Sequence, residues 1–432
     1  MVSPQTYRAP IAFMTGWLSV FAWLFTTASA ASFCAQLCLG LAAFYHEDYT
    51  PEPYQVWLIY TLIIIICAAF VCLLPKLVPI TESVFFWASV VGFVVSFIAL
   101  LAASKVKQPA SVVFTGWVNQ TGWSDGTAFM LAVGQSMYGF LCTDSATHIS
   151  EELPNPGRNV PRAMWLTIAI GIATTLPFTL AVLFSIQSFD ELSASALPIR
   201  EIYFQALNSK AGAAFFVFLI LFIYFGAVIG LVVTSGRLIW AFARDDGIPF
   251  PKVFSKTHPT LQTPVNATLL TAVFCILYGL IYIGSTEAFN SFVATSILSL
   301  NITYVIPQAI LLIRGRANVL PKRHFDLGAA FGTFCNVFSC AWVALYAVLF
   351  CFPIFLPVTA KSMNYVSVVM AGTVLFVVVM WFARGRGRFT GPNIQGLEVL
   401  SAVNMGQTGV FSAGRSVSER QEDAEEPRKV EA

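Results

Sequence analysis

The residue with the most chemical content is an acid at the end of an apolar segment. Residues 138–164 read YGFLCTDSATHISEELPNPGRNVPRAM, so Asp144 follows an apolar stretch and precedes a dense polar run. A carboxylate inside a hydrophobic segment is costly unless it faces a cavity or a partner, so such residues mark ion or substrate paths. The small and polar neighbours Gly139, Thr143 and Ser145 favour a helix break at this depth. Broken helices are how secondary transporters build their sites, and the pattern therefore predicts a substrate path through a membrane.

A second group of charges could pair across the polar run. Glu151 and Glu152 follow Asp144, where the chain is predicted to emerge from the membrane. Arg237 and Arg244 lie where a later predicted helix emerges on the same side. The two arginines are seven residues apart, which places them on one helix face. We interpret the four residues as an ion-pair cluster that acts as an inner gate. The alternative is that each charge only marks the headgroup boundary.

Apolar segments long enough to cross a bilayer must position these residues. The 432-residue chain is 57% hydrophobic and only 11% charged, which excludes an ordinary soluble domain. We predict ten membrane-spanning helices and hence an all-α polytopic membrane protein. They cover residues 11–33, 55–74, 80–103, 127–149, 164–187, 212–241, 266–284, 287–313, 328–352 and 365–383. The first is too long and too aromatic for a signal peptide, and no basic run precedes it.

The basic residues fix the predicted orientation. An even number of crossings puts both termini on one side, and 19 of the 24 lysines and arginines fall on that side. The positive-inside rule therefore predicts cytoplasmic termini in a membrane that we expect to be the plasma membrane. The loop of residues 105–126 is then outside, and Asn119, in an Asn-Gln-Thr sequon, becomes a candidate glycan acceptor. The alternative is an unused sequon.

One membrane domain and one tail account for the chain. Residues 1–388 form the predicted transmembrane domain, and residues 389–432, rich in Gly, Ser, Glu and Arg, a disordered cytoplasmic tail. The nine cysteines show no C-x-x-C pattern, so we expect neither a metal site nor a cofactor. A net charge of +2 gives no reason to expect a nucleic-acid partner. No enzyme motif occurs; only Asp144 and His148, at i and i+4, offer a catalytic pair, and we predict a protein that is not an enzyme.

Several blocks of sequence resemble the amino acid–polyamine–organocation permease superfamily. They are SEELPNPGRNVPRAM after a Gly-Phe-containing helix, followed by RLIWAFARDDGIPFPKVFSKTHPTLQTPVNA. Later blocks, LNITYVIPQAILLIRGR, FDLGAAFGTFCNVFSCAW and FPIFLPVTAKSMNYVSVVMAG, resemble its fungal amino acid/choline/GABA branch. The likeness covers nearly all of residues 7–392. It implies an inverted-repeat carrier of twelve helices, of which the ten predicted here would be helices three to twelve.

The resemblance also implies roles for single residues. Residues 138–144 would be the unwound part of the family's sixth helix, with Tyr138 or Phe140 as an aromatic lid or wall. Gly139 and Thr143 would belong to the same substrate site, and Asp144 would carry a proton. The implied function is a permease for amino acids or related amines such as GABA or choline, embedded in the lipid bilayer. Such carriers are driven by a proton or other ion gradient or by exchange, and H⁺ is the coupling ion that we expect. Because the family's glycine-rich first helix has no counterpart here, a truncated, non-transporting paralogue, or a nutrient sensor or scaffold, is the alternative, and we expect this chain to transport poorly.

Overall fold

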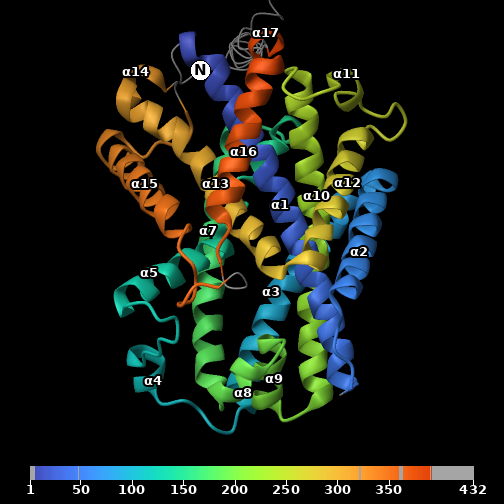
Figure 1. Ribbon diagram of the computed structural model, residues 1–432, viewed down its shortest axis with the longest axis vertical. Coiled ribbons are helices and arrows are strands. Elements are labelled where there is room, and N and C mark those ends of the chain that lie inside the picture. The colour runs from blue at the N-terminus through green and yellow to red at the C-terminus, as the bar shows by residue number, and fades with distance from the viewer. Residues whose placement is uncertain (1–4, 47, 321–322, 360–362, 390, 392–432) are drawn as a thin grey trace, which may run out of the picture.

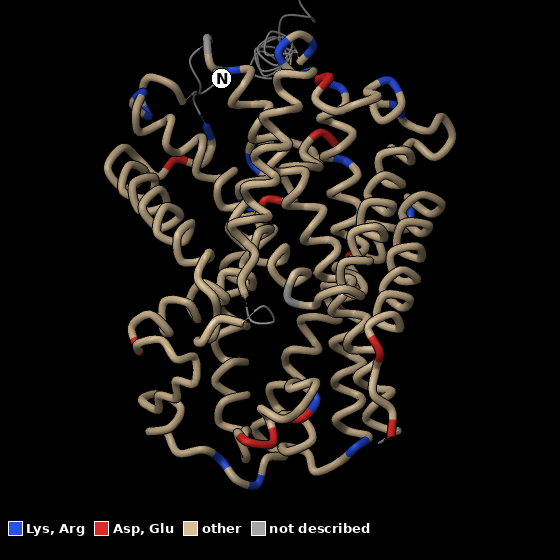
Figure 2. The backbone as a smooth tube through the Cα atoms, in the orientation of Figure 1, with Lys and Arg blue, Asp and Glu red and all other residues tan. Residues whose placement is uncertain are grey.

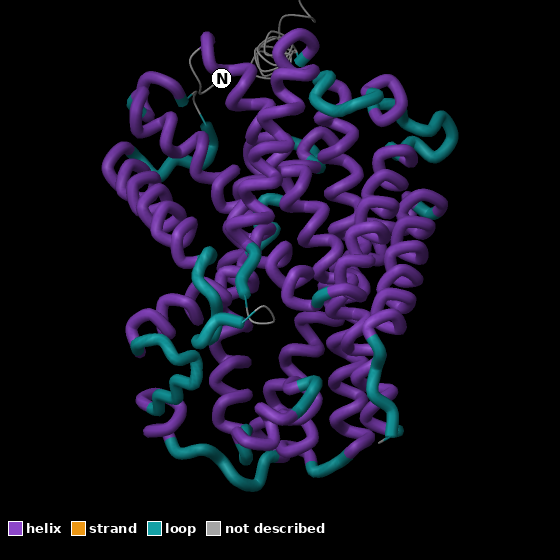
Figure 3. The backbone as a smooth tube through the Cα atoms, viewed as in Figure 1, coloured by secondary structure: helices purple, strands orange, loops and turns teal. Residues whose placement is uncertain are grey.

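Long helices make up the architecture (Figure 1). The computed structural model describes residues 5–46, 48–320, 323–359, 363–389 and 391. Within those ranges all regular structure is helical, without a strand (Figure 3). Nine helical stretches of the described residues are long and apolar enough to cross a membrane. They are built on α1 (Gln5–Tyr45), α2 (Pro53–Leu73), α3 (Val78–Ala103), α7 (Pro156–Ser185), α10 (Lys210–Arg244), α12 (Val265–Gly284), α13 (Thr286–Arg314), α15 (Ala329–Leu349) and α16 (Val366–Met380). The predicted all-α polytopic class is confirmed.

The fourth predicted span, residues 127–149, is not one continuous helix. It consists of α5 (Asp125–Ser136), the 3₁₀ turn η2 (Met137–Phe140), α6 (Ser145–His148) and a second 3₁₀ turn, η3 (Ser150–Glu152). Residues 141–144 lie outside any helix, and Cys142 adopts a positive φ of 63°, which a helix cannot contain. The span is therefore interrupted, and the break at residues 141–144 lies within the region of residues 138–144 where a helix break was expected.

Helix α1 is longer than predicted and lies at the centre of the molecule. Sequence hydropathy placed a span at residues 11–33, whereas the helix has 41 residues. At 1.5 Å per residue this is about 60 Å, twice the thickness of a hydrocarbon core. Its polar residues do not end it because Thr26 and Thr27 donate to the carbonyls of Ala22 and Trp23, each at 2.8 Å. Of its most apolar 18-residue window, 89% is buried, so α1 is a core helix surrounded by others.

Small residues allow the helices around α1 to approach closely. Thr27 of α1 and Ser235 of α10 share a hydrogen bond of 2.9 Å. A Cβ atom on Gly226 of α10 would lie 2.2 Å from Cγ of Phe85, so only glycine fits where α3 crosses α10. Such contacts drive helix association in a bilayer, where apolar burial alone gives little net gain.

The two ends of the bundle differ in charge. Helices α4 (Ala110–Thr115), α8 (Phe189–Ala194) and α9 (Pro198–Leu207) lie at one end (Figure 1). The other end carries the first described residues, α11 (Pro251–Phe254), α14 (Arg316–Val319), and α17 (Arg386–Arg388), which continues α16 through the π-helical turn η4 (Trp381–Gly385). A further turn, η1 (Pro75–Leu77), leads into α3. Most lysines and arginines lie at the end that carries α17 (Figure 2).

The predicted domain boundary is only partly covered. All of the helices above fall within the predicted transmembrane domain of residues 1–388. Of the predicted tail, residues 390 and 392–432 lie outside the described residues.

Candidate functional site

The helix break places Tyr138 against the central helix. Its hydroxyl shares a hydrogen bond of 2.8 Å with the Ser29 hydroxyl of α1. Its ring meets Phe33, also of α1, edge to face at 5.8 Å between centroids. Phe33 in turn meets Tyr224 of α10 at 6.1 Å. We call Phe33, Tyr138 and Tyr224 the aromatic junction. The sequence pointed to Tyr138 alone, because the other two side chains come from distant apolar helices.

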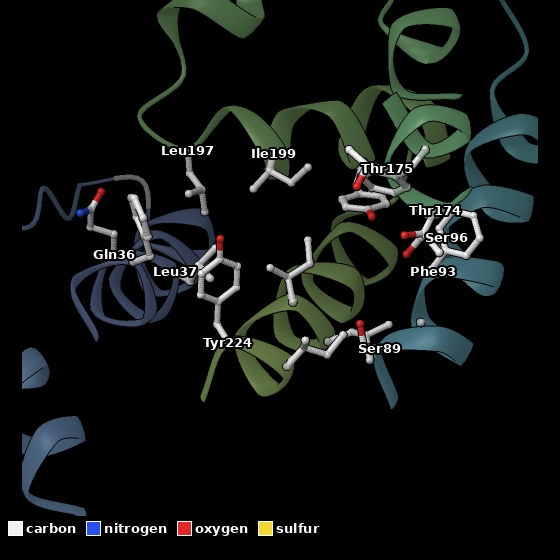
Figure 4. Close-up of a pocket in the computed structure, with 17 residues that line it drawn as sticks. Gln36, Leu37, Ser89, Phe93, Ser96, Thr174, Thr175, Leu197, Ile199 and Tyr224 are labelled. Carbon is white, nitrogen blue, oxygen red and sulfur yellow. The ribbon is translucent and has the colours of Figure 1, made fainter. Parts of the chain in front are cut away.

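Three cavities meet at the aromatic junction. The first, about 760 Å³, extends from Tyr138 and Gly139 to Glu152 and Arg237, and we call it the Arg237 cavity. The second, about 550 Å³, is lined by Tyr203 and lies between α1, α3, α7, α9 and α10 (Figure 4). The third, about 570 Å³, contains Asn290 of α13. Tyr224 lines the first and second cavities, Tyr138 the first and third, and Phe33 the second and third. A rearrangement of three rings could therefore connect or separate these spaces.

The polar groups of the second cavity face one another across an apolar interior. Figure 4 shows Gln36 and Leu37 of α1 near Tyr224 on one side. Ser96 of α3 and Thr174 of α7 lie on the opposite side.

Asp144 is held by two partners. The Tyr304 hydroxyl of α13 donates a short hydrogen bond of 2.5 Å to Asp144 Oδ1, and Nε2 of His148 lies 3.2 Å from Asp144 Oδ2. The side chains of Asp144 and His148 are only 13% and 15% exposed, and the Trp23 ring covers His148 edge to face at 5.2 Å. Nothing in the sequence signalled that Tyr304 pairs with an acid 160 residues away.

The other predicted substrate residues separate into two groups. Tyr138 and Gly139 line the Arg237 cavity, as do Cys142 and Ser145 on either side of Asp144. Phe140, Thr143 and Asp144 are not among the lining residues of the cavities described above. The Phe140 ring instead packs toward Gly171 of α7 and is 42% exposed. The 3₁₀ turn points successive side chains to different sides, so Tyr138 and Phe140 cannot both face one cavity.

The four predicted gate residues form two pairs. Arg237 donates through Nε and Nη2 to both oxygens of Glu152, the second at 2.9 Å. Arg244 donates through both terminal nitrogens to Glu151, at 3.0 and 2.9 Å. The pairs tie η3 to the end of α10. The glutamates are 56% and 61% exposed, so each pair contributes only about 0.2–1 kcal/mol, as exposed ion pairs do.

A further carboxyl lies beside these pairs. Burial raises the pKa of Asp245, just after α10, and Glu151 adds to the rise while Arg244 opposes it. The protonation of Asp245 is therefore coupled to the neighbouring Glu151–Arg244 pair.

The predicted glycan acceptor lies in an ordered turn. The Asn119 amide nitrogen donates to the Trp123 carbonyl at 2.7 Å and to Asp125 at 2.9 Å, and the Thr121 hydroxyl donates to the Asn119 side-chain oxygen at 2.7 Å. Among the residues that the structure describes, there is no group of three or more His, Cys, Asp or Glu side chains placed to bind a metal ion.

The bundle of membrane-spanning helices, with one interrupted span beside central cavities, defines a membrane carrier. A sequence profile of the amino acid permease family matches residues 1–378, and the chain belongs to this family. It is 35% identical over 392 residues to a choline transporter of Saccharomyces cerevisiae. The aligned region covers 90% of this chain and 69% of that protein.

Two other relatives are similarly extensive. The transmembrane transporter swnT of Metarhizium robertsii is 31% identical over 398 residues, covering 90% of this chain and 77% of its own. A putative amino acid/polyamine transporter of Macrophomina phaseolina is 29% identical over 375 residues, covering 85% and 82% respectively.

Proposed function

We propose that this permease moves amino acids or related amines, such as GABA or choline, across the plasma membrane. The observation that carries the proposal is the helix break at residues 141–144, which follows the turn that places Tyr138 on the Arg237 cavity and ends at the partnered acid Asp144. Aromatic rings attract an ammonium group through their faces, and the aromatic junction supplies three of them. The names of the relatives, which include choline and amino acid/polyamine transporters, support amines as the substrate class.

Proton coupling at Asp144 is the second part of the proposal. Its carboxylate is largely shielded from solvent, and each oxygen faces a group that can share a proton, Tyr304 on one side and His148 on the other. A proton bound at Asp144 would change both hydrogen bonds. It would thereby alter how the broken span is held against α13, which couples protonation to the shape of the site.

The inner gate and the membrane orientation complete the proposal. Glu152 and Arg237 line the Arg237 cavity at the end that carries most basic residues, and their pair, together with the pair Glu151–Arg244, is the proposed inner gate. That end is cytoplasmic by the positive-inside rule, and both termini are then inside. The proposed disordered tail of residues 389–432 would extend into the cytoplasm, and Asn119, at the other end, would be open to glycosylation.

The decisive experiment is uptake by a strain that lacks its own carriers. Radiolabelled GABA, basic and neutral amino acids, and choline are offered to cells that express the chain, with surface expression measured in parallel. We expect saturable uptake of at least one amine, in contrast to the poor transport that the sequence alone led us to expect, and Tyr138→Ala should reduce it at equal surface expression. No uptake of any of these compounds by a chain that reaches the surface would contradict the proposal and favour a sensor or scaffold.

A further inference from the structure

Four arginines gather where the first turns of α1 lie beside the end of α16 (Figures 1 and 2). Phe13 of α1 joins the two elements, because its ring centroid lies 5.3 Å from the centroids of both Trp381 and Phe389. One arginine precedes Phe13 on α1, and the other three lie on η4 and α17. We call these residues the arginine cluster: Arg8, Arg384, Arg386 and Arg388.

The arginine cluster lacks acids to balance it. Within the described part of the chain, none of its four side chains forms a hydrogen bond or an ion pair. The Nε atoms of Arg8 and Arg384 are buried without an acceptor, but their terminal nitrogens are not buried. Arg386 and Arg388 are exposed. A ligand at the surface can therefore reach the guanidinium groups, and positive charges that are partly desolvated and unpaired favour an anion there.

An exposed apolar stripe runs along α16 from the arginine cluster toward the middle of the bilayer. It consists of Leu375, Val379 and Phe382, whose spacing of four and three residues places them on one helix face. Arg386 follows Phe382 by four residues and so continues the stripe at its charged end. The opposite face carries Val377, which is buried against α1. A cation at the polar end of an apolar stripe matches a phosphate group with acyl chains beneath it.

We propose that the arginine cluster binds the headgroup of an anionic phospholipid, with the phosphate at Arg386 and the acyl chains along the exposed stripe of α16. Charge complementarity selects this occupant, because each basic residue beside a membrane strengthens the attraction to anionic lipids and a guanidinium fork fits a phosphate. The cationic group of a zwitterionic lipid opposes this attraction, and a soluble phosphate compound lacks the acyl chains. The site shares no residue with the aromatic junction or the inner gate, and lipid binding there does not depend on which amine is transported.

Photo-cross-linking to the purified full chain tests the site. The chain is placed in nanodiscs of phosphatidylcholine that contain a trace of phosphatidylserine with a photoreactive group on one acyl chain, and the cross-linked peptides are identified by mass spectrometry. We expect cross-links on residues 375–382 in excess over those from the matching phosphatidylcholine probe. Unlabelled phosphatidylserine should compete for them, whereas glycerophosphoserine, the headgroup without acyl chains, should not.

Competition by unlabelled phosphatidylserine gives the relative affinity of each variant. Arg386→Gln should weaken binding roughly fivefold, because one of the charges that attract the lipid is lost. High salt should weaken binding to the unmodified chain, since it screens the same charges. Arg158→Gln removes an equal charge from an exposed arginine at the start of α7, and this matched control should bind as the unmodified chain does.

The other outcomes overturn the proposal. Equal cross-linking of residues 375–382 by the two lipid probes would show that the stripe is an ordinary lipid contact. Equal weakening in Arg158→Gln and Arg386→Gln would show that net charge, and not the arginine cluster, attracts the lipid. Competition by glycerophosphoserine would reveal a site for soluble phosphate compounds instead. If Arg386→Gln does not fold, Arg388→Gln, also exposed, must weaken binding for the proposal to stand.

Discussion

Loss of the Glu152–Arg237 pair should more often expose the Arg237 cavity to the side of the membrane that we propose is cytoplasmic. Arg237 is 18% exposed and Glu152 56%, so solvent screens the pair in part and about 0.2–1 kcal/mol is the appropriate scale. Since 1.4 kcal/mol is a factor of ten, Glu152→Gln should raise the open fraction by roughly one and a half to fivefold. The Arg244–Glu151 pair is more exposed on both sides and remains to hold the gate.

The native thiol of Cys142 reports on this opening because it lines the same cavity. In a chain whose other cysteines are replaced by alanine, a membrane-impermeant thiol reagent is added to inside-out vesicles and the rate of labelling is measured. We expect faster labelling in Glu152→Gln by the factor above, and a smaller difference at high salt, which screens the pair. The exchange of charges, Glu152→Arg with Arg237→Glu, should restore the slow rate, and Glu191→Gln should leave it unchanged.

Two results would refute the reasoning. Equal labelling of Glu152→Gln and the parent chain would show that the pair does not control access. Fast labelling of the charge-exchanged chain would show that the faster labelling results from changing these side chains, and not from losing the attraction between the two charges.

Four further outcomes are expected. Asp144→Asn should reach the cell surface but flatten the pH dependence of uptake, and unchanged pH dependence with normal uptake would rule out its coupling role. Single cysteines introduced between α3 and α5 should react with an impermeant reagent in intact cells, whereas labelling only after permeabilisation would reverse the proposed orientation. Asn119→Gln should increase gel mobility through loss of a glycan, and identical mobility would show an unused sequon. Gly226→Ala should lower the melting temperature, because overpacking against Phe85 costs about 1–3 kcal/mol, while Gly126→Ala, with no atom within 4 Å of the added Cβ, should not; equal melting of the two would contradict the contact of α3 with α10.

The sequence alone was sufficient for the class of protein and for the ends of most helices. Apolar length is a local property, so α2, predicted at residues 55–74, is found at Pro53–Leu73, and α12, predicted at 266–284, at Val265–Gly284. It was insufficient for the full length of α1, whose polar residues bond to their own backbone and to α10, and for the partners of the interrupted span, although the small and polar residues around Cys142 did indicate the break itself. In both, contacts with other helices outweigh local hydropathy.

The charged residues show the same division. Two glutamates and two arginines on one side of the membrane are visible in the sequence, but which arginine meets which glutamate depends on how α10 packs against η3. The sequence marked Asp144 because an acid is conspicuous in an apolar run. It gave no reason to pair that acid with Tyr304, since a tyrosine in a membrane helix is common and sequence separation carries no information on contact.

Glu82 marks the limit of sequence reasoning most clearly. In the sequence it lies two residues inside a predicted span, where a charge is easily taken for a boundary marker, and Trp23 is one aromatic residue among many. Only the packing of α1, α3 and α10 around one cavity shows that, within the described part of the chain, the acid lacks a donor and the indole lacks an acceptor. Hydropathy and spacing determine which segments enter the membrane. Whether a polar group there is satisfied depends on its neighbours in three dimensions, and the tertiary structure alone decides it.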